Sequence, residues 1–257
     1  ISSHLSHRNV KVKQYVRVKI VNKMASSSNV DPERKVAQAG VPSLCHFRSC
    51  DFDNVYEPAE DTFLFLDALQ DELCTDENSS GFLARHPPRL VLELGPGSGV
   101  LSTFLLQKCR SHFGLAIDIN RHAACSTTRT AVENSVGDRF DCVQGDLLTS
   151  LRDIEGEKQL VDVYLFNPPY VPSPASELEE KDSISLAWAG GDRGREVIDR
   201  FLVQIAPRLV RSNAVLYLLL EERNDLADTN KFAEDLGLTG VCLLKKKVPG
   251  EKLSIWR

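Results

Sequence analysis

The chain has 257 residues, of which 42% are hydrophobic and 26% are charged, and its formal net charge is −5. This composition excludes disordered and fibrous proteins, and the length suits one α/β domain or two small ones. No apolar run approaches the roughly 20 residues that a membrane-spanning helix needs.

The first segment of the chain is strongly basic. Residues 1–23 carry six basic and no acidic side chains, so the rest of the chain carries 25 basic against 36 acidic ones. The only methionine is Met24, so this segment either precedes the true start or is an organellar transit peptide. Residues 25–55 are polar and serine-rich, which predicts a loosely ordered arm. We therefore expect a basic leader and flexible arm over 1–51 and a folded domain over 52–257.

The first predicted helix of the domain begins near Pro58, which suits the first turn of a helix. Glu60 and Asp61 complement the positive end of the helix dipole. An apolar face then follows at helical spacing, made of Phe63, Leu66, Leu69 and Leu73.

Strands and helices alternate beyond a polar linker. Strands are predicted at 89–94, 113–118, 140–144, 161–166 and 215–220, helices at 99–110, 120–136, 196–209 and 224–236, and a terminal hairpin at 241–247 and 252–256. Asn120 is expected to cap one helix and Gly137 to close it. Segment 161–166 is nearly all apolar, as in a strand buried on both faces. Repeated βα units predict an α/β fold with an open, mostly parallel sheet and helices on both faces.

A glycine-rich loop, Glu93-Leu94-Gly95-Pro96-Gly97-Ser98-Gly99, lies between the first strand and its helix. Gly95 permits a tight turn, Gly97 lets a ligand approach the backbone, and Gly99 opens the helix. A purely structural turn is the simpler alternative. The third small residue of a dinucleotide fingerprint is missing, since Val100 stands there, and no Lys-Ser/Thr follows as in a P-loop. This form is typical of methyltransferases that use S-adenosylmethionine.

Acidic residues stand at the ends of successive strands. Asp118 ends the second strand, where its carboxylate can accept both ribose hydroxyl hydrogens. Asp146 follows the third strand and can accept from an adenine amino group. Either acid alone suits a helix cap or a solvated loop, but with Glu93 they predict a nucleoside pocket.

The tetrapeptide Asn167-Pro168-Pro169-Tyr170 follows the buried strand 161–166. A planar NH2 group is a poor nucleophile because its lone pair is delocalised. The Asn167 side-chain oxygen and the Pro168 carbonyl can accept its two hydrogens, and prolines add no competing N–H. Tyr170 offers a flat face for stacking. These residues predict alignment of a carboxamide or an adenine, although Asn-Pro-Pro is also a good turn sequence.

These motifs together resemble the HemK-like glutamine N5-methyltransferases, in the eukaryotic and archaeal branch that acts on class I translation termination factors. The resemblance covers about 52–257. It rests on Val55-Tyr56-Glu57-Pro58-Ala59-Glu60-Asp61-Thr62, on the glycine loop with Leu92, on Asp118-Ile119-Asn120, on Phe166-Asn167-Pro168-Pro169-Tyr170-Val171, and on Ala187-Trp188-Ala189-Gly190-Gly191 with Gly194-Arg195-Glu196. The first and last of these blocks are the most specific.

The resemblance implies a seven-stranded, Rossmann-like S-adenosylmethionine-dependent methyltransferase domain. The implied substrate is the glutamine of a Gly-Gly-Gln motif in a class I release factor, and the implied partner is a small zinc-binding activator protein. Cofactor contacts are implied for Thr62, Glu93, Gly95, Asp118, Asp146, Leu147 and Asn167, with Gly97 and Gly99 added from the glycine loop. Pro96 replaces the more usual serine and should stiffen the turn.

Several alternatives stay open. Adenine-N6 methyltransferases share Asn-Pro-Pro-Tyr, but the acidic body and the lack of a recognition domain after Tyr170 disfavour nucleic acid. A non-catalytic scaffold and a lysine methyltransferase fit the intact motif less well. Residues 172–185 suggest a solvated loop, beside which Trp188 either borders the substrate entrance or packs beneath. The seven scattered cysteines form no Cys-x-x-Cys pair, so we expect no metal site and a reducing, intracellular compartment. The expected location is the cytoplasm, with the nucleus as a second candidate.

Overall fold

The computed structural model describes residues 40–257 except 77–78, 110–111, 150, 152–159, 175–183 and 211. The basic leader, the start of the arm and most of the predicted loop at 172–185 therefore lie outside the described residues. Within the described part of the chain, no helix has both the length and the apolar character needed to cross a bilayer.

A seven-stranded mixed sheet organises the domain, and its strand order is β5-β4-β3-β6-β7-β9-β8. The strands are β3 (Leu90–Leu94), β4 (Phe113–Asp118), β5 (Phe140–Gln144), β6 (Val163–Phe166), β7 (Val215–Glu221), β8 (Cys242–Val248) and β9 (Glu251–Trp256). The first five strands of that order pair in parallel, whereas β9 pairs antiparallel with both β7 and β8. The predicted α/β sheet and its antiparallel terminal hairpin are thus confirmed.

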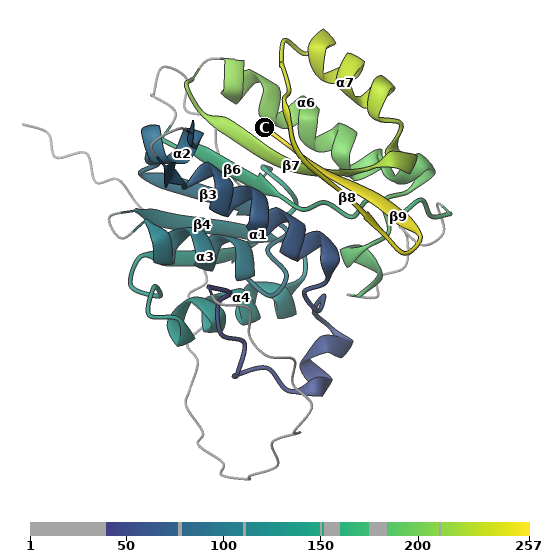
Figure 1. Ribbon diagram of the computed structural model, residues 1–257. Helices are drawn as coiled ribbons and strands as arrows, with labels where there is room; N and C mark the ends of the chain where they lie inside the picture. The colour runs from purple at the N-terminus through teal and green to yellow at the C-terminus, as the bar shows by residue number, and fades with distance from the viewer. Residues whose placement is uncertain are drawn as a thin grey trace, which may run out of the picture. The chain divides into compact units, whose positions relative to one another are not determined.

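Helices cover both faces of this sheet, with α1, α3 and α4 on one side and α6 and α7 on the other (Figure 1). Their bounds are α1 (Glu60–Glu72), α2 (Phe82–Arg85), α3 (Val100–Lys108), α4 (Arg121–Glu133), α6 (Glu196–Val210) and α7 (Leu226–Asp235). Short elements complete the described fold: 3-10 turns η1 (Ser49–Asp53), η2 (Ser185–Ala187), η3 (Asp192–Gly194) and η4 (Glu222–Asn224), and the small pair β1 (Thr75–Asp76) and β2 (Ser79–Ser80).

The core lies between the sheet and these helices. All four residues of β6 are buried, as its apolar sequence predicts for a central parallel strand. On one side, Leu66 and Leu69 of α1 are at most 5% exposed. On the other, Phe201 of α6 packs edge-on against Phe166, with ring centroids 4.6 Å apart.

Three helix ends differ from the sequence prediction. Pro58 lies outside the first turn, because α1 begins at Glu60 with Ala59 as its N-cap. Gly137 does not close α4, which ends at Glu133; Ser135 takes the left-handed conformation with φ 60° instead. The last predicted helix, 224–236, begins two residues late, because Asn224 ends the 3-10 turn η4 and Asp225 is the N-cap of α7. Helix boundaries depend on local hydrogen bonds that residue propensities fix only loosely.

The described end of the predicted flexible arm is packed rather than loose. Phe47 and Val55 are 3% and 2% exposed and form a cluster with Ala123 of α4. The Asn134 side chain accepts from Ser43 N at 2.8 Å and donates back to Ser43 O at 2.8 Å. Residues 40–55 are therefore part of the folded domain, held by contacts with α4 that composition alone does not reveal.

The carboxyl ends of four parallel strands meet along one edge of the sheet. Leu94 is in register with both Ile117 and Phe166, and Asp118 is in register with Gln144. The loops that follow these strands therefore emerge side by side, which is where open α/β sheets bind ligands.

Candidate functional site

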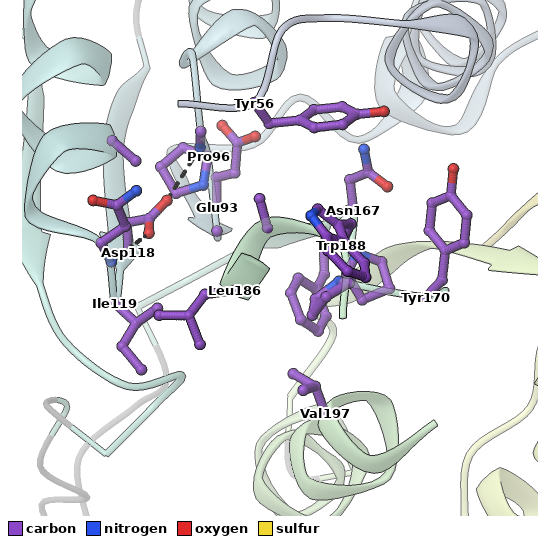
Figure 2. Close-up of a pocket in the computed structure, with 18 of the residues that line it drawn as sticks. Tyr56, Glu93, Pro96, Asp118, Ile119, Asn167, Tyr170, Leu186, Trp188 and Val197 are labelled. Carbon is purple, nitrogen blue, oxygen red and sulfur yellow. Dashed lines mark hydrogen bonds between the residues drawn. The ribbon is translucent and has the colours of Figure 1, made fainter. Parts of the chain in front are cut away.

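A cavity of about 640 Å³ opens at this edge of the sheet (Figure 2). Its volume falls in the roughly 300–1,000 Å³ range of small-ligand sites. Among the residues lining it are eleven of the twelve predicted site residues, namely Thr62, Glu93, Gly95, Gly97, Asp118, Asp146, Leu147, Asn167, Pro168, Pro169 and Tyr170. The exception is Gly99.

The glycine loop combines left-handed backbone with close packing. Gly95 and Gly97 have φ angles of 57° and 56°. A Cβ atom at Gly97 would have no neighbour nearer than 4.0 Å, so this side of the loop is open for a ligand. Gly99 is the N-cap of α3, and a Cβ there would lie 2.9 Å from the Thr127 Cα. The packing of the start of α3 against α4 therefore requires glycine at position 99.

Two buried carboxyl groups lie under this loop. Asp118 accepts from Gly97 N at 3.2 Å and from Asn120 N at 2.8 Å, and burial raises its pKa to about 6 despite these bonds. Glu93 accepts from the backbone N–H and hydroxyl of Ser102, and burial raises its pKa to about 8. At neutral pH, Glu93 is mostly protonated and Asp118 is mostly ionised. Asp118 is thus the stronger hydrogen-bond acceptor of the two.

Asp146 lies at the rim of the cavity in a loop held by α6. Its carboxylate forms a 2.6 Å ion pair with Arg200, and both side chains are about half exposed. The next residue, Leu147, has φ 48°, which is unusual outside glycine. Gln204, one turn beyond Arg200, accepts from Leu148 N at 3.0 Å. The loop conformation is therefore fixed from α6, and Asp146 keeps lone pairs free for another donor.

Asn167 belongs to the cavity lining and has an unpaired acceptor. Its Nδ2 donates to Asp61 Oδ2 at 2.8 Å, whereas its Oδ1 is buried with no hydrogen-bond partner among the described residues. Such orphaned buried acceptors are uncommon, and beside a cavity they favour a role in binding or catalysis. Figure 2 shows Asn167 at the same end of the cavity as Tyr56 and Tyr170.

Tyr170 is held at both its ends. Its hydroxyl donates to Glu251 Oε2 at 3.1 Å, and its backbone carbonyl accepts from Asn224 Nδ2 at 2.8 Å. Burial, together with the charges of Asp61 and Glu251, raises the pKa of Tyr170 above its ordinary value. The phenol therefore stays protonated and acts as a donor and a stacking surface, not as a base.

The Trp-Ala-Gly-Gly block packs against the Asn-Pro-Pro-Tyr loop. Val171 pairs with Ala189 in an isolated parallel bridge, and Val171 N donates to Trp188 O at 3.0 Å. A Cβ at Gly190 would lie 2.6 Å from the Pro169 carbonyl oxygen. Trp188 lines the cavity and is 36% exposed, which agrees with the entrance alternative for this side chain.

Sequence reasoning missed three side chains that shape the site. Asp61 was assigned to the helix dipole, yet it is 3% exposed and bonded to Asn167. Asn224 is fully buried and donates to the carbonyls of Tyr170 and Arg193. Glu251, in the terminal hairpin, receives the Tyr170 hydroxyl. Only Asp61 carried a signal, because it belongs to the Tyr-Glu-Pro-Ala-Glu-Asp-Thr block.

Gly194→Ala is expected to lower the melting temperature by roughly 6–12 °C, which corresponds to about 3 kcal/mol of stability. A Cβ at this position would lie 1.9 Å from the Tyr170 carbonyl oxygen, at φ 67°. Calorimetry should compare it with Gly250→Ala, which has φ 84° but nothing within 4 Å. Equal effects of the two substitutions would show that backbone strain, and not packing on Tyr170, accounts for the loss.

The fold and the cavity define a class of enzyme. The open cradle at Gly95 and Gly97, the ionised Asp118 and the unpaired Asn167 oxygen fit a nucleoside with an electrophilic methyl group. These features are those of an S-adenosylmethionine-dependent methyltransferase, in which cofactor and acceptor meet at the carboxyl ends of the parallel strands.

Comparisons with known proteins agree. Residues 76–183 match the family described as Methyltransferase small domain. Methyltransferase HEMK2 of Mus musculus is 39% identical over 207 residues, 80% of this chain and 90% of the mouse protein. A Methanocaldococcus jannaschii protein named for protein N5-glutamine methylation is 32% identical, over 79% of this chain and 92% of its own.

A solved structure has the same fold and a sequence identity close to that of the archaeal relative. It is the Mtq2–Trm112 complex of E. cuniculi, responsible for methylation of the eRF1 translation termination factor. The match has a TM-score of 0.56 and 30% identity, and covers 79% of this chain and 96% of that one. The chain belongs to the HEMK2/Mtq2 family of methyltransferases, which confirms the resemblance found in the sequence.

Proposed function

We propose that this protein transfers a methyl group from S-adenosylmethionine to the side-chain amide nitrogen of glutamine in the Gly-Gly-Gln motif of a class I release factor. The observation that carries the proposal is Asn167, a residue of the cavity lining whose buried Oδ1 has no hydrogen-bond partner among the described residues. Membership of the HEMK2/Mtq2 family supports the same activity.

The chemistry required of the protein is alignment. Asn167 Oδ1 and the Pro168 carbonyl accept the two amide hydrogens and direct the nitrogen lone pair toward the methyl group. Pro168 and Pro169 have no N–H groups to compete for these acceptors. Tyr170, fixed by Glu251 and Asn224, lies against the flat carboxamide. Orienting two reactants in this way can contribute roughly 7–11 kcal/mol to lowering a barrier.

The cofactor is held by the residues around the glycine loop. When bound, S-adenosylmethionine supplies a methyl group already activated by a sulfonium. Asp118 accepts from the ribose hydroxyls, Asp146 with Leu147 binds the adenine, and Gly95 and Gly97 let the cofactor approach the backbone. Glu93 and Thr62 complete the cofactor site from β3 and α1.

A small activator protein is the proposed partner, by analogy with Trm112 in the Mtq2–Trm112 complex. We expect this activator to bind zinc, whereas the described residues of this chain contain no cluster suited to a metal ion. The chain outside its basic leader is acidic, which favours a basic protein substrate over nucleic acid. Release factors act in the cytoplasm, which is the proposed site of action, with the nucleus as a further location.

Labelled cofactor offered to a release factor, with the activator present, should label the wild-type factor and not its Gln-to-Ala variant. Omitting the activator should reduce the signal. Duplex DNA and single-stranded RNA serve as the nucleic-acid arms, because the same acceptors could bind an adenine amino group. Label on nucleic acid alone would replace the proposed substrate by adenine.

A further inference from the structure

We propose that Asp61 is a positioning residue, which fixes the amide orientation of Asn167 so that its oxygen, and not its nitrogen, faces the substrate. The proposal rests on the proposed function, since it explains how the acceptor for the glutamine amide is set. Asp61 lies at the start of α1, 106 residues from Asn167 in the sequence, and its Oδ2 is 2.8 Å from Asn167 Nδ2.

The orientation follows from the hydrogen-bonding capacities of the two groups. An ionised carboxylate only accepts, whereas a carboxamide has one accepting and one donating end. With Asp61 on one side, the favourable arrangement of Asn167 turns Nδ2 toward Asp61. The opposite end, Oδ1, is then turned away from Asp61, where it is buried without a partner and able to accept from a substrate N–H. If the Asn167 carboxamide were reversed, its Oδ1 would lie against the Asp61 carboxylate. Its Nδ2 would then face the NH2 group of the substrate, so that a donor would meet a donor.

Asp61 is itself held firmly. It is 3% exposed, and its Oδ1 accepts from Thr62 N at 2.7 Å. The hydroxyl groups of Thr62 and Tyr56 both lie 3.3 Å from the same oxygen. Oδ2 is thereby left for Asn167. Since Thr62 and Tyr56 line the cavity as well, α1 and the residues before it form one wall of the substrate site.

Asp61→Asn tests this role with almost no change in size. The introduced amide can keep its oxygen on Thr62 N, which turns its NH2 toward Asn167. Asn167 must then present Oδ1 to that NH2 and Nδ2 to the substrate. We expect kcat to fall about 100-fold, by analogy with loss of one oriented hydrogen-bonding group at an active site. The KM for the release factor and the Kd for S-adenosylmethionine should change by less than about threefold.

A swapped pair distinguishes positioning from a general structural role. Asn167→Asp alone sets two carboxylates against each other and should be nearly inactive. In the double variant Asp61→Asn with Asn167→Asp, the introduced amide donates to the introduced carboxylate, whose other oxygen again accepts from the substrate. The double variant should therefore recover at least tenfold in kcat over each single variant. A purely structural loss predicts no recovery.

The controls separate failure of this proposal from failure of the proposed function. Asp67→Asn changes an exposed acid on the same helix and should leave kcat and melting temperature unchanged. If the wild-type enzyme with its activator does not methylate the release factor, the proposed function is wrong. If it does, and Asp61→Asn keeps wild-type kcat or the double variant is no better than the single ones, Asp61 does not position Asn167.

Discussion

Asn167→Ala is expected to lower the rate of methyl transfer by about 10³-fold or more and to leave the Kd for S-adenosylmethionine within a few-fold. The substitution removes the acceptor at the point where the glutamine nitrogen must be aimed. Loss of one oriented hydrogen-bonding group at an active site typically costs about 10²–10³ in kcat. Here Pro168 is left as the only proposed acceptor, and the delocalised amide has no other means of activation in the described site.

A radiolabel assay on the release factor gives the rate, and calorimetry gives the cofactor Kd. Asn213→Ala, at an exposed residue before β7, is the matched control and should behave as wild type in both measurements. Asn167→Ala also removes the Nδ2 hydrogen bond to the buried Asp61 carboxylate, which costs roughly 1–3 kcal/mol, so the melting temperature should fall by about 2–12 °C and the rate is measured below it. Turnover retained by Asn167→Ala would contradict the alignment mechanism.

The place of the site in the fold was predictable because it depends on the alternation of strands and helices along the chain. Alternating βα units predict a parallel sheet, and a parallel sheet brings every strand's carboxyl end to one edge. Asp118 and Asn167 could therefore be placed together from their positions after strands, and the structure has both in the cavity lining.

The supporting side chains were not predictable in the same way. Asp61 and Asn167 are 106 residues apart, and Glu251 is 81 residues from Tyr170. Their pairing depends on where α1 and the β8–β9 turn come to rest against the sheet, which no local pattern encodes. The sequence places Asn224 at the start of a helix. Its side-chain donor contacts to three loop carbonyls could not be predicted, because the loops come together only after folding.

Asp118→Ala is expected to weaken S-adenosylmethionine binding by about 10³-fold. An ionised carboxylate that accepts both ribose hydroxyls makes two charge-assisted hydrogen bonds, each contributing about 1.5–3 kcal/mol. Asp118 also accepts from Gly97 N and Asn120 N, so its loss loosens the glycine loop that borders the cofactor. Calorimetry should show the loss, with Asp138→Ala as the control at an acid whose side chain is 78% exposed. Unchanged affinity would mean that the ribose lies elsewhere.

The pH dependence of cofactor binding provides a test of Asp118 without any substitution. Burial raises the pKa of Asp118 to about 6, so the free enzyme takes up a proton at this group as the pH falls below that value. A protonated carboxyl has lost acceptor capacity, and bound cofactor must displace the proton. Affinity should therefore change little between pH 7 and pH 6.5, where Glu93 is already mostly protonated, and fall up to about tenfold per pH unit below pH 6. Asp118→Ala should abolish this dependence, since it removes the titrating group. A wild-type Kd that stays level from pH 7 to pH 5 would show that the cofactor does not use the ionised form of Asp118.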